Sequence, residues 1–79
     1  MNIKDYTCGA SINAQRAIKS IKNKTTEEVI SILNNLNNVK VSRTAYKRYL
    51  GTIFISYRYL DITFLINLNK NDIIITSNN

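Results

Sequence analysis

The last third of the chain alternates apolar side chains with other side chains at nearly every second position. The alternation occurs in three runs, separated by residues 60–61 and 70–71. A period of two places one set of side chains on one face of a β-strand. The sequence therefore predicts a C-terminal three-stranded antiparallel β-meander with one apolar, inner face. That face consists of Ile53, Ile55, Tyr57, Tyr59, Ile62, Phe64, Ile66, Leu68, Ile73 and Ile75.

The positions of the two turns determine the register of this meander. Turns centred on residues 60–61 and 70–71 bring apolar residues opposite one another on the same face. Leu60 and Asp61 are not residues that a two-residue hairpin turn prefers, so a wider or bulged turn is favoured there. The expected pairs are Tyr59–Ile62, Tyr57–Phe64, Ile55–Ile66 and Ile53–Leu68 at the first turn, and Leu68–Ile73 and Ile66–Ile75 at the second.

Two amphipathic helices are predicted before the meander. The first occupies residues 10–23, with Ser11 as a plausible N-cap. The second begins at Thr25, because Thr25 and Glu28 form a capping-box pattern, and it ends by Asn38 in an Asn-rich segment of poor helix formers. The apolar stripes are Ala14, Ala17, Ile18 and Ile21 on the first helix, and Val29, Ile32, Leu33 and Leu36 on the second.

Residues 39–51 connect these helices to the meander. Residues 39–41 are typical of a strand stub. Ser42 is a good N-cap for a third, short helix over residues 43–50, and Gly51 suits its C-terminal end. The whole chain is therefore predicted to be one small basic α+β domain over residues 1–79. Its two to three N-terminal helices would pack on one face of the C-terminal meander.

Helices followed by a short third helix and a β-hairpin also occur in this order in winged helix-turn-helix domains. In that arrangement the third helix would present Arg43, Thr44 and Lys47 to a major groove. The hairpin at residues 58–61 would be the wing. The long segment between the helices and the third strand of the meander depart from this pattern.

Several classes of site lack the residues that they need. The chain has no His and one Cys, Cys8, so we expect no metal, no disulfide and no cofactor. With Gly9 and Gly51 as its two glycines, it has no Gly-rich phosphate loop, and no carboxylates are paired for catalysis. No leader pattern and no run of about 18–20 apolar residues is present, which predicts a cytoplasmic protein without membrane contact.

Positive charge dominates the chain and is unevenly distributed. Eleven Lys and Arg stand against five Asp and Glu, a formal net charge of +6. Basic groups neutralise phosphates and aromatic rings stack on unpaired bases, so the expected partner is a nucleic acid, a nucleoprotein or an acidic protein surface. The alternative is a solvated basic surface. The candidate contact residues, in two acid-free segments at 10–24 and 29–60, are Arg16, Lys19, Lys22, Arg43, Tyr46, Lys47, Arg48 and Arg58.

Three apolar residues fall on the other, outer face of the predicted meander. Phe54, Leu65 and Ile74 lie on neighbouring strands and form one patch in the predicted register. Such a patch is a candidate protein interface or homodimer surface. The alternatives are that residues 1–9 cover it, or that these are scattered surface residues of no consequence.

These features favour a small, non-enzymatic, regulatory binding protein of the kind that a phage or another mobile element encodes. One alternative is a protein–protein inhibitor of a host nucleic-acid-handling machine, such as an anti-CRISPR protein. Another is an enzyme, because the order of helices followed by a sheet is similar to that of small ribosome-dependent toxin ribonucleases. That resemblance implies metal-free RNA cleavage, with Tyr46, Lys47, Arg48 and Arg58 stabilising the phosphorane or moving the proton.

Overall fold

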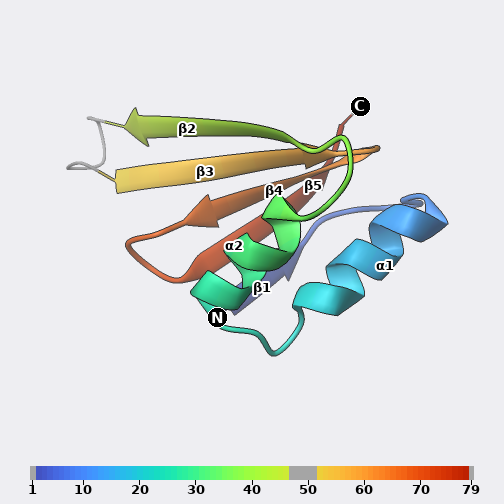
Figure 1. Ribbon diagram of the computed structural model, residues 1–79, viewed down its shortest axis with the longest axis horizontal. Coiled ribbons are helices and arrows are strands. Elements are labelled where there is room, and N and C mark those ends of the chain that lie inside the picture. Colours follow the sequence, from blue (N-terminus) through green and yellow to red (C-terminus); the bar gives the residue numbers. More distant parts are fainter. Residues whose placement is uncertain (1, 47–51, 79) are drawn as a thin grey trace.

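The computed structural model describes residues 2–46 and 52–78, in which two helices pack on a five-stranded sheet. The strands form one mixed sheet in the order β1-β5-β4-β3-β2, and both helices lie on the same side of it (Figure 1). The α+β class is therefore correct, but a sheet of only three strands is wrong. The elements are β1 (Asn2–Asp5), α1 (Ile12–Ile21), α2 (Thr26–Asn34), β2 (Lys40–Tyr46), β3 (Thr52–Tyr59), β4 (Ile62–Asn67) and β5 (Asp72–Ser77).

Both helices begin at the caps that the sequence predicts. The Ser11 hydroxyl accepts a hydrogen bond from the Ala14 amide at 3.3 Å. Thr25 and Glu28 form a complete capping box, in which each side chain accepts from the other residue's amide, at 3.2 and 3.0 Å. The buried residues belong to the predicted stripes: Ala14, Ala17, Ile18 and Ile21 on α1, and Val29 and Leu33 on α2.

The segment predicted to begin a third helix forms β2 instead. Its residues pair one by one with β3, from Lys40 opposite Arg58 to Tyr46 opposite Thr52. Local helix propensity is a weak preference, whereas this pairing satisfies backbone groups that β3 would otherwise expose at an edge. The winged helix-turn-helix arrangement is therefore wrong. The remainder of that predicted helix, residues 47–50, lies outside the described residues.

The first residues of the chain extend the sheet and do not cover its outer face. β1 pairs in parallel with β5, with Ile3 opposite Ile73 and Asp5 opposite Ile75. Four residues are too few for an alternation pattern to be recognised in the sequence. The partner strand also lies at the other end of the chain, so no local signal predicts this pairing.

The last three strands run antiparallel to one another, as predicted, with one change of register. The β3–β4 pairs agree with the predicted pairs, but β5 is displaced by two residues, so that Ile66 lies opposite Ile73 and Phe64 opposite Ile75. Because the displacement is even, every side chain keeps its predicted face. The displacement makes room for a four-residue turn at 68–71, which ends at Asn71 with φ 53°.

The turn between β3 and β4 has two residues, so the expected wider turn is wrong. Leu60 adopts the left-handed region, with φ 52°, which is unfavourable for a residue with a Cβ. Contacts from elsewhere in the chain hold this turn in place. The Asp61 carboxylate accepts hydrogen bonds from the Ser11 amide at 2.9 Å and from the Ser11 hydroxyl at 3.0 Å. The Asn78 amide donates to the Asp61 carbonyl at 2.9 Å.

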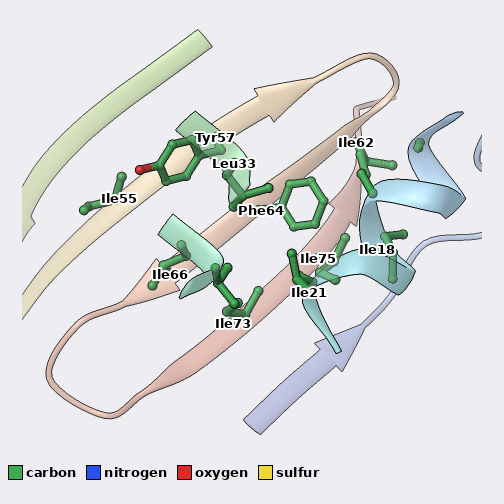
Figure 2. Close-up of a cluster of buried hydrophobic side chains, with 13 residues drawn as sticks. Ile18, Ile21, Leu33, Ile55, Tyr57, Ile62, Phe64, Ile66, Ile73 and Ile75 are labelled. Atoms are coloured by element: carbon green, nitrogen blue, oxygen red, sulfur yellow. The ribbon is translucent and has the colours of Figure 1, made fainter. Parts of the chain in front are cut away.

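The core lies between the helices and one face of the sheet, which we call the inner face (Figure 2). Figure 2 shows Phe64 between strand residues and the helix residues Leu33, Ile18 and Ile21. Burial of each such side chain stabilises the fold by roughly 1.5–3 kcal/mol before entropy is counted. The sheet contributes Ile55, Tyr57, Ile62, Phe64, Ile66, Ile73 and Ile75 to this core.

Candidate functional site

The hairpin formed by β2 and β3 extends beyond both helices at the end where β2 leads to β3 (Figure 1). In the first half of β2 the inner face is only partly covered. Val41 is 52% exposed and Arg43 is exposed, although both lie opposite inner-face residues of β3. Exposed side chains therefore occur on both faces of β2, at Lys40 and Val41, near the end of the hairpin that is away from this connection.

Two cations lie directly opposite each other on this hairpin. Lys40 pairs in register with Arg58, and both side chains are exposed. Together with Asn38 and Leu60 they line an open hollow of about 320 Å³. Like charges that face each other across two strands are destabilising. The Lys40–Arg58 pair is thus a concentrated positive charge with room beside it.

The pair lies on the outer face of the sheet, which we define as the face away from the helices. Both helices pack on the inner face, so within residues 2–46 and 52–78 no helix covers the outer one. Hydroxyl groups, amides, a few apolar side chains and two charged ones make up the rest of this face. The described strand residues with side chains on it are Asn2, Lys4, Lys40, Ser42, Phe54, Ser56, Arg58, Thr63, Leu65, Asn67, Asp72, Ile74 and Thr76.

The predicted apolar patch lies on this outer face. Leu65 is directly opposite Ile74, and Phe54 is opposite Asn67, diagonal to Leu65. All three apolar side chains are half-buried. The suggestion that residues 1–9 cover them is wrong for β1, which pairs at the edge of the sheet beside β5.

The candidate cations on α1 form a separate group. Arg16, Lys19 and Lys22 are exposed on the helix layer, which lies on the inner side of the sheet (Figure 1), whereas Lys40 and Arg58 have their side chains on the outer face. Lys19 and Lys22 line another open hollow, of about 280 Å³, together with Asp5. The predicted basic residues therefore do not form one continuous surface.

Arg43 differs from the other hairpin cations because it lies opposite the inner-face residue Ile55. It lies near the ring of Tyr57, which is 2% exposed. Burial raises the pKa of Tyr57, and a hydrogen bond with Asn34 and the charge of Arg43 partly oppose this effect. Tyr57 is a core residue, as predicted, and Arg43 contributes to its surroundings.

Three further candidates cannot be assigned to a surface. Tyr46 belongs to β2, opposite Thr52, but its side chain lies outside the described residues, as do Lys47 and Arg48. Sequence reasoning did not select Lys40 or Lys4, which the structure brings to the outer face. For Lys40, the missed signal was the alternation of Lys40, Ser42 and Thr44, which continues the strand beyond the predicted stub.

Other kinds of site are not supported in the described part of the chain. No group of three or more His, Cys, Asp or Glu within residues 2–46 and 52–78 is placed to hold a metal ion. None of the helices in these ranges has the length and apolar character needed to span a bilayer.

No protein-family model, curated protein or solved structure was found to match this chain.

Proposed function

We propose that this protein binds nucleic acid through the Lys40–Arg58 pair and the outer face of the sheet around it. The observation that supports this proposal is the direct opposition of two exposed cations on a face that no described helix covers. Binding is the whole of the proposed activity, with no catalytic step.

A phosphate group is the ligand that best satisfies this arrangement. Placed over the hollow beside the pair, one phosphate would accept charge-assisted hydrogen bonds from both Lys40 and Arg58. Its negative charge would offset the repulsion between the two cations. The guanidinium of Arg58 offers a planar fork that suits phosphate oxygens. The sequence reinforces the charge, because residues 29–60 contain five Lys and Arg and no Asp or Glu. A polyanion is thus attracted to the whole β2–β3 hairpin.

The test compares two double variants with the same change in charge. Lys40→Ala/Arg58→Ala removes the pair, and Arg16→Ala/Lys19→Ala removes two exposed cations from α1. Fluorescence anisotropy with labelled single-stranded and duplex DNA and RNA gives the affinity between 50 and 200 mM salt. The affinity falls as the salt concentration rises, and each lost phosphate contact reduces the magnitude of the slope of log K against log salt by about 0.7–0.9. We expect the slope to fall by about 1.5 in the first variant and to change little in the second.

Two results would overturn the proposal. In the first, both variants lose affinity equally, which would mean that net charge and not the outer face determines binding. In the second, the wild-type protein binds none of these nucleic acids at low salt. The patch of Phe54, Leu65 and Ile74 would then be the remaining surface for a protein target. Denaturing gels of the same RNA mixtures report whether the strand is cut, which would replace simple binding by the ribonuclease alternative.

A further inference from the structure

We infer that the ligand is single-stranded nucleic acid, which crosses the outer face from the Lys40–Arg58 pair towards Lys4 and places bases on Leu65 and Ile74. This inference rests on the proposed function and names the kind of strand that the same face binds.

The register of four strands places the residues of this path in a row. Ser56 on β3 lies opposite Leu65 on β4, Leu65 opposite Ile74 on β5, and Ile74 opposite Lys4 on β1. Arg58 is two residues from Ser56 along β3, so its side chain is on the same face. The row therefore has apolar residues at its centre and a cation towards each end.

The spacing of the strands suits a short stretch of nucleotides. Neighbouring strands lie about 4.8 Å apart, so the three intervals from β3 to β1 span about 14 Å. Lys4 and Arg58 are both exposed and have long side chains that reach beyond their own strands. A strand held at Arg58 and at Lys4 would place its bases over Leu65 and Ile74.

The two apolar residues favour unpaired bases over a duplex. In a duplex the base faces are stacked on one another, and the phosphates meet the protein first. Unpaired bases expose a flat apolar surface that packs on side chains. Leu65 and Ile74 keep part of their surface exposed because no described helix covers them, and a base would remove that surface from water. Only a single strand uses both the cations and the apolar centre.

Among the described residues, one acid lies on this face, and its position indicates where the phosphates run. Asp72 lies on β5, two residues from Ile74, and it pairs with Asn67. Thr76 lies two residues from Ile74 in the other direction, opposite Thr63 and in the row of Arg58. The phosphates should therefore follow the row of Lys40, Arg58, Thr63 and Thr76, away from Asp72.

The deciding experiment uses matched Thr substitutions, which preserve β-propensity. Leu65→Thr/Ile74→Thr removes the apolar centre, and Val41→Thr changes an exposed residue of β2 on the other face. Affinities are measured for a single-stranded RNA of about 12 nucleotides and for its duplex. We expect the wild type to prefer the single strand at least tenfold. The double variant should lose about tenfold for the single strand and almost nothing for the duplex, as expected when unpaired bases lose their apolar contact with Leu65 and Ile74. Val41→Thr should match the wild type.

Equal affinity of the wild type for the single strand and the duplex would overturn the inference. So would a folded double variant with unchanged affinity for the single strand. In either case a dependence on Lys40 and Arg58 would leave the proposed function standing, whereas loss of all nucleic-acid binding would remove both.

A second pair of variants decides the question if the Thr double variant does not fold. Lys4→Ala should lower the salt slope for the single strand by about 0.7, while Lys70→Ala, in the exposed turn after β4, should leave it unchanged. An unchanged slope for Lys4→Ala would overturn the proposed path.

Discussion

The two faces of the sheet are built from alternate residues of the same strands, yet they differ in almost every physical property. On the inner face Phe64, Ile66 and Ile73 are 0% exposed and pack against the helices. On the outer face their chain neighbours Leu65 and Ile74 are half-buried and lie among hydroxyl groups and cations. This comparison teaches that the period of two assigns neighbouring residues alternately to a buried face and to a partly exposed face.

The separation matters because a domain of this size has little stability in reserve. A single core in a chain of 79 residues supplies roughly 3–5 kcal/mol. One large truncation on the inner face can remove most of that. Changes on the outer face should therefore alter binding while the protein stays folded.

The largest effect should come from Phe64→Ala, compared with Leu65→Ala one residue later. The inner-face truncation leaves a cavity and should cost about 3–5 kcal/mol, enough to unfold most of the protein at 25 °C. Leu65 loses less buried surface, so Leu65→Ala should cost about 1 kcal/mol. Urea unfolding followed by circular dichroism measures both. Equal losses would show that the two faces contribute equally to stability and would break the comparison.

Acid should destabilise the protein by protonating two carboxylates that lie at the ends of elements and on neither face of the sheet. The Ser11 amide donates to Asp61 and the Thr25 amide donates to Glu28, and each of these hydrogen bonds lowers the pKa of its carboxyl. Because the folded pKa lies below the unfolded one, this stabilisation is complete above the unfolded pKa. It is lost as the pH falls from about 5 through the folded pKa. The urea midpoint should therefore decrease between pH 6 and pH 3.

Asp61→Asn tests the origin of this acid sensitivity. The variant should be less stable than the wild type at pH 7, and the difference should be smaller at pH 3, because protonation of Asp61 removes the charge that strengthens its hydrogen bonds with Ser11. A difference of the same size at both pH values would contradict the role of the Asp61 charge. Leu65→Ala is the control, since its difference from the wild type should not depend on pH.

The smallest effect should be a gain in stability at the turn where β3 leads into β4. Leu60 is 53% exposed and has φ 52°, a conformation that Asn adopts more readily than Leu. Leu60→Asn should raise the unfolding free energy by roughly 0.5 kcal/mol and the Tm by a few degrees. Differential scanning calorimetry measures the change. A lower Tm would show that the Leu60 side chain contributes more by contact than it costs in backbone strain.

The candidate site was only partly predictable, because charge is visible in a sequence and proximity is not. Arg58, Leu65 and Ile74 belong to the predicted meander, where the alternation places them on one face, and the structure puts them on one face. Lys40 was missed because its neighbours 42–50 favour a helix when β3 is ignored. The cations of α1 belong to the helix layer. The apolar stripe of α1 is buried against the core, so the opposite side of this helix, which carries the cations, faces solvent.

The sequence by itself determined the features that depend on near neighbours: the caps at Ser11 and Thr25, the apolar stripes of both helices, and the division of the last strands into two faces. These follow from hydrogen bonds and periodicities that span only a few residues. Only the tertiary structure decided that β1 pairs with β5, that residues 40–46 form a strand, and that Ser11 and Asn78 hold the Leu60 turn. Each of these depends on backbone or side-chain partners in another part of the chain, whose hydrogen bonds outweigh local preference.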